Sequence, residues 1–268
     1  HVSSRRQRQM CIRDRALPYA NAPLHLGHIL EAVQTDIWTR FQNLNGNECH
    51  FFCADDTHGT PVMLKANEMG ITPEKLIEDV YQDHKSTYEL YDINFANFYS
   101  THSDENKKYS EFIYKCAKEN KLISKSVVKQ YFDEKEKMFL SDRFIKGTCP
   151  KCGAENQHGD NCGVCGASYN VLEIENPVST ISNTKPVKKE SEHIFFDLPA
   201  KRDMLKEFIE KVDIQESIKN KLKEWLGDDL KKWDISRDAP YFGFEIPGED
   251  NKFFYVWVDA PIGYIASI

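Results

Sequence analysis

Four cysteines in the middle of the chain have the spacing of a metal site. Cys149 and Cys152 form one Cys-x-x-Cys pair, and Cys162 and Cys165 form a second pair after nine intervening residues. Four thiolates complete the tetrahedral shell of a zinc ion and leave no position open for water or substrate, so we predict a structural zinc site. A redox dithiol is the alternative, although one pair would suffice for it. His158, between the pairs, is expected to be a solvated loop residue rather than a spare ligand.

Two histidines near the front of the chain are candidates for phosphate chemistry. His25 and His28 lie at the start of a predicted helix, directly after a proline-bounded loop at residues 16–23. Free N–H groups and the positive end of the helix dipole favour phosphate there, and imidazoles can donate hydrogen bonds to charge that develops on a phosphoryl oxygen. Gly27 is expected to let a ligand approach the backbone closely. Taken alone, the same two histidines also fit a helix cap or a metal site.

The composition is that of a globular protein. Of 268 residues, 40% are hydrophobic and 29% are charged, and the sequence has no apolar run of the roughly 20 residues that a membrane helix needs. The formal net charge of -7 argues against a surface that binds nucleic acid throughout, although one local basic face is compatible with it. Clustered cysteines without a secretory signal favour metal over disulfides. We therefore expect a cytoplasmic protein without a membrane segment, and its oligomeric state stays open.

Several stretches of the chain together resemble one enzyme family. Residues 25–28 (HLGH) resemble the HIGH signature of class I aminoacyl-tRNA synthetases, and residues 16–23 resemble the methionine-specific form of the preceding loop. The further matching stretches are residues 54–61, 233–243 and 255–264, in fitting order and at fitting distances. From Ala16 to its end the chain is therefore similar to the methionyl-tRNA synthetases.

This resemblance implies a fold and a domain order. The family has an α/β, Rossmann-like catalytic domain with a parallel sheet, interrupted by a small connective-peptide insertion that carries the zinc knuckles. We accordingly expect the first part of the catalytic domain at residues 16–118, the insertion at residues 119–232 and the return to the catalytic domain at residues 233–268. Residues 1–15 contain five arginines and lie outside the family pattern, either as a basic tail or as a translated cloning or assembly junction.

The resemblance also implies a reaction, its partners and its site. In the family, the carboxylate of methionine attacks the α-phosphate of magnesium-bound ATP, and the methionyl-adenylate then acylates tRNA(Met). His25 and His28 would act on the ATP phosphates and the transition state, and Asp56 would bind the α-ammonium of methionine. The implied ATP-binding residues are Pro18, Tyr19, Asn21, His25, Gly27 and His28. The implied methionine-binding residues are Ala16, Leu17, Tyr19, Asp56, Trp257, Ala260, Pro261 and Tyr264.

The chain departs from the family pattern in two places. The family's first strand should precede Ala16, but residues 10–15 carry charges where that strand would be buried, so we expect the strand to be missing or malformed. The sequence ends at Ile268, before a KMSKS-type loop and an anticodon-binding domain. We therefore expect little or no aminoacylation by these residues alone.

Two other functions and one local ambiguity stay open. A zinc-knuckle protein could bind nucleic acid without catalysis, and a nucleotidyltransferase that does not act on tRNA would also explain the two histidines. Neither alternative explains residues 255–264. The charged residues Asp234, Arg237 and Asp238 form either a salt-bridged hinge or a ligand contact.

Hydrophobic periodicity predicts the elements that position these residues. A helix after residue 27 should bury Ile29, Val33, Ile37 and Phe41 on one face. The other predicted elements are strands at residues 49–54, 127–132, 138–140, 194–196 and 253–258, helices at residues 73–88 and 104–118, and helical periodicity at residues 205–230.

Overall fold

The computed structural model describes residues 10–227 and 230–268. The chain divides into two compact units. The first unit contains the described residues up to Cys116 together with residues 241–248 and 253–268, and the second contains residues 117–240 and 249–252. In the described ranges, no helix has the length and the apolar character that crossing a bilayer requires.

A parallel three-stranded sheet forms the centre of the first unit. The middle strand β2 (Glu48–Asp55) lies between β1 (Met10–Arg13) and β3 (Asn97–Ser100), and both neighbours run parallel to it. Every second residue of β2 from Cys49 to Cys53 is buried, as the alternation of side chains in a strand requires. The strand predicted at residues 49–54 and the α/β class with a parallel sheet are both confirmed.

The strand β1 corrects the expectation that no proper strand precedes the loop at residue 16. Met10–Arg13 pair in register with residues 48–51 of β2. The charged side chains are tolerated because strand pairing uses only main-chain hydrogen bonds, so the side chains can contact solvent or an aromatic ring. Met10 is 67% exposed, and the guanidinium carbon of Arg13 lies 3.7 Å from the centre of the Trp38 ring.

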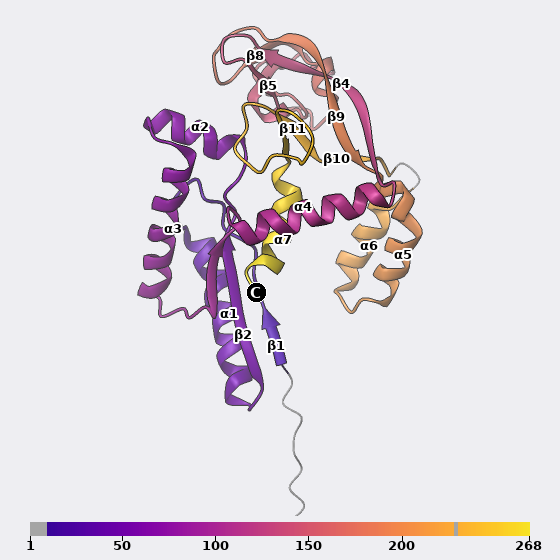
Figure 1. Cartoon of the computed structure of the whole chain (residues 1–268). Coiled ribbons are helices and arrows are strands. Elements are labelled where there is room, and N and C mark those ends of the chain that lie inside the picture. Colours follow the sequence, from indigo (N-terminus) through magenta and orange to yellow (C-terminus); the bar gives the residue numbers. More distant parts are fainter. Residues whose placement is uncertain (1–9, 228–229) are drawn as a thin grey trace, which may run out of the picture. The chain divides into compact units, whose positions relative to one another are not determined.

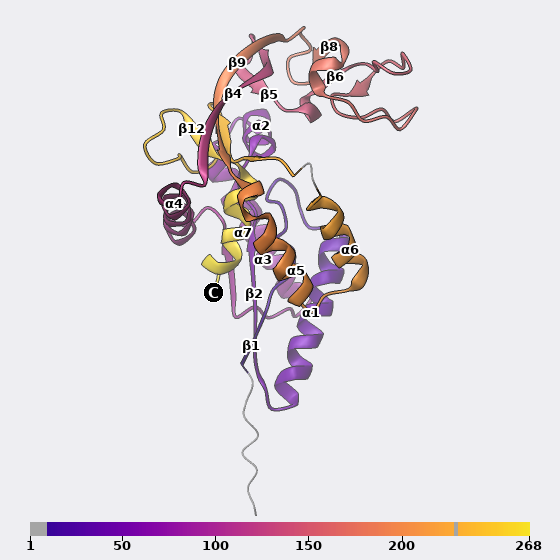
Figure 2. The same cartoon turned by 90° about the vertical axis from the view of Figure 1, so that its right-hand side faces the viewer.

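The described residues of the first unit form five helices, of which α2 was not predicted from the sequence. They are α1 (Leu26–Leu44), α2 (Thr60–Met69), α3 (Pro73–Leu90), α4 (Asp104–Glu119), which continues into the second unit, and α7 (Val256–Ala266). Both views show α1 lying along β2 (Figure 1, Figure 2). The predicted helices at residues 73–88 and 104–118 are confirmed.

The buried face of α1 differs from the predicted one. Its buried residues are Ile29, Ala32, Asp36 and Thr39. Of the predicted face, Ile29 is buried and Val33 packs on the core, whereas Ile37 and Phe41 are 61% and 57% exposed. The core that α1 meets contains Phe51, Tyr88 and Ile93, and the small Ala32 allows close approach to it. Packing against the sheet therefore outweighs the apolar periodicity in setting the helix rotation.

The strand predicted at residues 253–258 is wrong beyond Phe254. β12 spans Lys252–Phe254, and α7 begins at Val256. Aromatic and β-branched residues favour a strand by propensity, but tertiary packing overrides such a preference. Gly263 explains part of this packing, because a Cβ there would lie only 2.7 Å from Cγ2 of Thr101.

An antiparallel sheet organises the second unit. Its strands, in the order β10-β9-β4-β5, are β10 (Trp233–Asp234), β9 (Val187–Phe196), β4 (Ile123–Asp133) and β5 (Met138–Leu140). These confirm the strands predicted at residues 127–132, 138–140 and 194–196. Two helices, α5 (Arg202–Lys211) and α6 (Glu216–Trp225), follow β9, so the predicted helical stretch at residues 205–230 is divided in two. Residues 228–229 of this stretch lie outside the described residues.

A smaller sheet in the second unit carries the cysteines. Its order is β7-β6-β8, with β6 (Ile145–Thr148), β7 (Gln157–His158) and β8 (Glu175–Ser179). Short 3-10 helices lie at Asp142–Phe144, Val171–Glu173 and Leu198–Lys201. Within this unit, Figure 2 shows the small sheet beyond the end of the β4–β9 pair that is far from α5 and α6.

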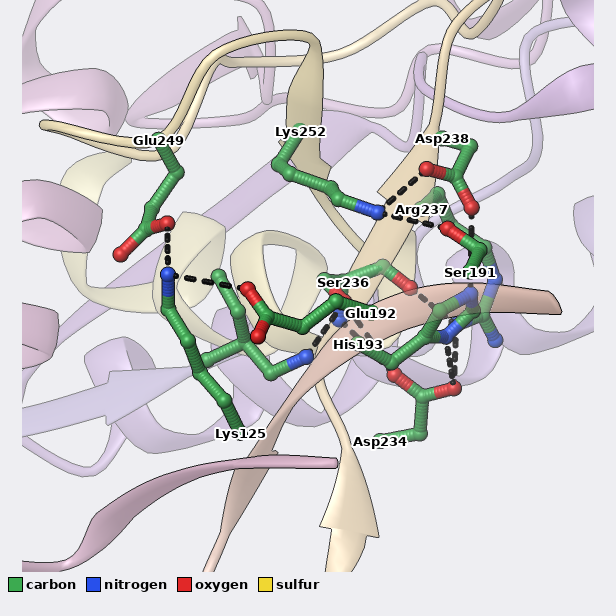
Figure 3. A network of polar contacts seen from close by, with 11 residues as sticks. Lys125, Ser191, Glu192, His193, Asp234, Ser236, Arg237, Asp238, Glu249 and Lys252 are labelled. Atoms are coloured by element: carbon green, nitrogen blue, oxygen red, sulfur yellow. Dashed lines mark hydrogen bonds and ion pairs between the residues drawn. The ribbon is translucent and has the colours of Figure 1, made fainter. Parts of the chain in front are cut away.

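A polar network joins β9 to the following strands of the second unit (Figure 3). The ring of His193 on β9 lies 2.7 Å through Nδ1 from Asp234 and 3.1 Å through Nε2 from Asp238 on β11 (Ser236–Asp238). Arg237 lies 3.5 Å from Asp234, and Lys252 binds Asp238. Of the two possibilities for the charged residues 234, 237 and 238, these contacts match the ion-paired one.

Candidate functional site

The two histidines at the start of α1 cap the helix. His25 is the N-cap residue, and its Nδ1 accepts a hydrogen bond of 3.0 Å from the N–H of Gly27. The Nδ1 of His28 accepts one of 3.3 Å from the N–H of His25, and the two rings stack with centroids 3.7 Å apart. In a neutral imidazole only one nitrogen carries a proton, so acceptance at Nδ1 leaves Nε2 as the donor in both rings. Capping and phosphate binding are thus compatible in this pair.

The surroundings of His28 keep its ring neutral. Burial, followed by electrostatic interaction with His25 and Arg15, lowers the pKa of His28 from its usual value. A neutral ring here donates one hydrogen bond from Nε2 without an added full charge.

The loop before α1 is tied to the end of β2. The N–H of Ala20 donates to the carbonyl of Asp56, and the N–H of Asp56 donates to the carbonyl of Pro18, both at 2.8 Å. The hydroxyl of Tyr19 donates to the carbonyl of His58 at 2.8 Å. These bonds place Pro18 and Tyr19 beside Asp56. Of the other predicted loop residues, Ala16 is exposed, and Leu17 and Asn21 are half-buried.

Asp56 has the properties of a cation-binding carboxylate. Its Oδ1 is buried and has no hydrogen-bond partner among the described residues. Burial, followed by the negative charges of Asp259 and Asp55, raises the pKa of Asp56 to about 8. A buried carboxylate with an unused oxygen and no cation beside it is stabilised when a positively charged ligand arrives.

Of the predicted residues on α7, some lie near Asp56 and others are exposed to solvent. The N–H of Leu17 donates to the hydroxyl of Tyr264 at 3.4 Å, and burial raises the pKa of Tyr264, with the charge of Asp56 among the smaller causes. Ala260 is buried, whereas Pro261 is exposed and Trp257 is 63% exposed. The structure thus brings Leu17, Asp56 and Tyr264 together, and it does not enclose Trp257.

Sequence reasoning missed two buried histidine–aspartate pairs in the first unit. His58 is hydrogen-bonded through Nδ1 to Asp259, and its Nε2 lies 2.9 Å from Nδ1 of His102. His84 lies 2.8 Å from Asp55. The available signals were weak: His84 occupies a position on the apolar face of its predicted helix, and His58 and Asp259 lie within stretches that resemble the family.

The four predicted cysteine ligands converge. The sulfurs of Cys149, Cys152, Cys162 and Cys165 all lie within 4.8 Å of one another. Cys152 and Cys162 are 3.6 Å apart, and Cys149 and Cys165 are 4.0 Å apart. A tetrahedral zinc ion with bonds of about 2.3 Å places its sulfurs about 3.8 Å apart, so this donor set fits zinc. His158 is exposed and outside the cluster.

Two matching turns present these sulfurs. Gly153 donates to the carbonyl of Cys149 at 3.0 Å, and Gly166 donates to that of Cys162 at 2.9 Å. Both glycines have a positive φ, of 74° and 71°, which a residue with a side chain rarely adopts. The backbone N–H of Cys165 lowers the pKa of Cys162 to about 6, so a thiolate is present near neutral pH.

Comparison with known proteins gives a family and a fold. Residues 13–268 match a model for "tRNA synthetases class I (M)". A Mycobacterium tuberculosis methionyl-tRNA synthetase bound by methionyl-adenylate is similar over 97% of this chain and 46% of its own, with a TM-score of 0.71 and 20% sequence identity. A second structure of that protein in complex with methionyl-adenylate is similar over 97% of this chain and 47% of its own, with a TM-score of 0.73 and 20% identity.

This chain therefore spans about half the length of those two proteins, and the likeness at 20% identity establishes a shared fold, the Rossmann-like fold of class I synthetases. The family model, in contrast, covers nearly all of the sequence, and it agrees with the parallel sheet, the HLGH helix start and the four-cysteine cluster. The chain belongs to the class I (M) tRNA synthetases.

Proposed function

We propose that this chain provides the amino-acid activating site of a methionine–tRNA ligase, which joins methionine to ATP as methionyl-adenylate and transfers it to tRNA(Met). The observation that carries this proposal is the Oδ1 of Asp56, which has no hydrogen-bond partner in the described part of the chain and lies beside the loop that leads into the HLGH helix. An amino acid activated at its carboxylate keeps its α-ammonium, and that ammonium supplies the cation that Asp56 lacks. Family membership and the methionyl-adenylate complexes of the two similar structures agree with this substrate.

The ATP side of the site is assigned to the loop and the start of α1. We infer that Pro18, Tyr19 and Asn21 shape the nucleotide pocket. His25 and His28 would donate from Nε2 to the phosphate oxygens, on which negative charge grows as the carboxylate attacks the α-phosphate and pyrophosphate leaves. The protein contributes position and hydrogen bonds rather than a covalent intermediate, and Mg²⁺ accompanies the ATP.

The methionine side of the site is assigned around Asp56. Its carboxylate would bind the α-ammonium, with the hydroxyl of Tyr264 and the backbone of Leu17 close by. Aromatic and apolar walls suit a polarizable thioether. The remaining proposed contacts are Ala16, Tyr19, Trp257, Ala260 and Pro261. Because Trp257 is 63% exposed, its part in the pocket requires the ligand to cover it.

The cysteine cluster is assigned a structural role. Four thiolates saturate a zinc ion, so the metal would hold the β7-β6-β8 sheet together and supply no reactive water. We propose that residues 119–232 are a connective-peptide insertion between two parts of the catalytic domain, at residues 16–118 and 233–268. Cytoplasmic location is part of the same proposal.

Calorimetric titration of the chain with methionine tests the proposal. We expect saturable binding that Asp56→Asn weakens at least about tenfold, because a hydrogen bond between charged groups contributes about 1.5–3 kcal/mol. Asp79→Asn is the matched control, since Asp79 pairs with Lys75 on the exposed face of α3. Absence of methionine binding in a folded, zinc-loaded chain, with binding of single-stranded RNA instead, would favour the zinc-knuckle binding module.

A further inference from the structure

The ring of His84 bridges two parts of the first unit. His84 lies on α3 and is fully buried, with 0% exposure. Its Nδ1 lies 2.8 Å from Oδ1 of Asp55, and its Nε2 lies 2.9 Å from the carbonyl oxygen of Ala22. A carbonyl only accepts hydrogen bonds, and so does an ionised carboxylate. Nε2 must therefore donate to the Ala22 carbonyl. With Asp55 ionised, Nδ1 donates as well, and His84 is an imidazolium paired with Asp55.

The charged groups around His84 support this protonation state. Burial alone would lower the pKa of His84, but the hydrogen bond to Asp55 and the charge of Asp55 outweigh burial and raise it, with a smaller contribution from Asp83. In the other direction, the charge of His84 is among the causes that lower the pKa of His28. Burial raises the pKa of Asp55, and the hydrogen bond and charge of His84, followed by the charge of Arg15, oppose this rise. Arg15 also contributes to the lowered pKa of His28.

The Ala22 carbonyl lies where the loop turns into α1. Residues 18–20 are held by the backbone of Asp56. Ala22 comes two residues later, and the N-cap His25 follows after Pro23 and Leu24. Pro23 has no N–H to bind, so a hydrogen bond to the Ala22 carbonyl is a direct way to hold this half of the loop.

We propose that His84 is a positioning residue that holds the loop before the HLGH helix start, by donating from Nε2 to the Ala22 carbonyl while Asp55 orients the ring. Its relevance to catalysis rests on the function proposed above. The catalytic residue candidates would be His25 and His28, and His84 would touch neither ATP nor methionine. A misplacement of about 1 Å at a reacting group can cost on the order of a hundredfold in rate, so a bond at this point of the loop matters.

Two substitutions separate the two bonds of the ring. The side-chain amide of asparagine falls near Nδ1 of a histidine, so His84→Asn keeps a donor for Asp55 and loses the one for Ala22. The amide of glutamine falls near Nε2, so His84→Gln keeps the donor for Ala22 and loses the one for Asp55. Both variants remove the charge, and they differ in which of the two hydrogen bonds is kept.

Amide hydrogen exchange measured by NMR gives a readout that needs no ligand. The N–H groups of Gly27 and Ile29 are bonded to His25, and that of Ala20 is bonded to Asp56. In His84→Asn we expect Gly27 and Ile29 to exchange about tenfold faster while Ala20 is unchanged. In His84→Gln we expect all three to stay within about twofold of the wild type. Equal effects of the two variants, or no effect on Gly27 and Ile29, would overturn the proposal.

Kinetics and a wild-type titration complete the test. In methionine-dependent pyrophosphate exchange, His84→Asn should raise the KM for ATP about tenfold and leave the KM for methionine unchanged. In His84→Gln, the KM for ATP should stay close to the wild-type value. Absence of exchange in the wild type leaves the hydrogen-exchange result to decide on His84, because little or no activity is expected of these residues alone. If His84→Asn does not fold, the amide hydrogen exchange of Gly27 and Ile29 is instead measured in the wild type as a function of pH, with correction for the intrinsic exchange rates. Protection of Gly27 and Ile29 that falls as pH rises through the raised pKa of His84 supports the bond to Ala22, and protection that does not change with pH refutes it.

Discussion

The imidazole of His25 fills the space beside Gly27 that any side chain there would need. A Cβ on Gly27 would lie 2.8 Å from Cε1 and 3.0 Å from Nδ1 of His25. We expected this glycine to admit a ligand to the backbone, but in the described structure it admits a histidine of the same chain. The glycine is required by this close approach, since it sits inside an ordinary helical turn of α1.

Gly27→Ala should therefore reduce activity more than stability. The added methyl displaces the His25 ring and removes a helix cap, which costs about 1 kcal/mol, while alanine in a helix gains about 1 kcal/mol over glycine. We expect the free energy of unfolding to change by less than about 1 kcal/mol, and pyrophosphate exchange to fall about a hundredfold. Leu26→Ala, at an 81% exposed position of the same turn, is the control. Full activity of the alanine variant would show that the place of His25 is unimportant.

Methionine binding should release a proton from Asp56. Its pKa is raised to about 8 in the free chain, so the carboxyl is mostly protonated at pH 7. An ammonium beside it favours the ionised form, and we expect close to one proton to be released at pH 7. Calorimetry in phosphate and in Tris measures this release, because the two buffers differ in their ionisation enthalpy. A wild type that releases no proton, or an Asp56→Asn variant that releases as many, would contradict the assignment.

The raised pKa of Asp56 also predicts how the stability of the chain changes with pH. The folded chain holds a proton on Asp56 that the unfolded chain, with a pKa of 3.8, has lost. The contribution of Asp56 to the free energy of unfolding therefore decreases as pH rises from about 4 to about 8. Asp56→Asn should remove this contribution, so that the variant gains in stability relative to the wild type over the same range. Parallel stability curves for the two proteins would show that the carboxyl is ordinary.

Zinc removal should unfold the small sheet of the second unit. Metal binding to four thiolates is worth on the order of 10 kcal/mol and exists only in the folded site. We expect one zinc per chain by elemental analysis, and we expect a chelator or Cys162→Ser to abolish hydrogen-exchange protection across residues 145–179. Cys116→Ser is the control, because Cys116 is half-buried and outside the cluster. Unchanged protection in the metal-free chain would argue that the sheet does not depend on zinc.

Because of His193, the stability of the second unit should decrease as pH rises. An ordinary buried, neutral histidine has the opposite effect. Burial would lower its pKa, but hydrogen bonds from the ring to Asp234 and Asp238 raise it. Its contribution to stability is then fully present below about pH 6.5 and is lost as pH rises through the folded pKa. Arg237 and Lys252 are the cations that lie beside these carboxylates (Figure 3).

His193→Gln tests this dependence. It leaves two carboxylates without their shared cation, so we expect a loss of about 3 kcal/mol at pH 6 that shrinks towards pH 9. Thermal unfolding followed by circular dichroism measures the difference. His158→Gln, at an exposed position, is the control. A difference that stays constant with pH would mean that His193 is neutral in the folded chain.

Some features of the site follow from local sequence, and the structure confirms them. The cysteine cluster is one, because each Cys-x-x-Cys turn positions its own two sulfurs. β2, α3 and α4 are others, because their apolar periodicity agrees with the packing they meet. In contrast, the exposed side of α1 and the helical state of residues 256–258 were predicted wrongly, since each depends on which surface the element meets.

The sequence by itself determined the family, the parallel α/β class, the four metal ligands and the pair of histidines at a helix start. Only the tertiary structure decided that His25 and His28 cap their own helix, that one oxygen of Asp56 has no partner within residues 10–227 and 230–268, and that buried histidines pair with Asp55 and Asp259. The physical reason is distance along the chain. The knuckles are turns of four residues, whereas His84 and Asp55 are 29 residues apart and His58 and Asp259 are 201 residues apart. Which buried histidine meets which carboxylate is set by the packing of whole elements, and a single sequence does not show it.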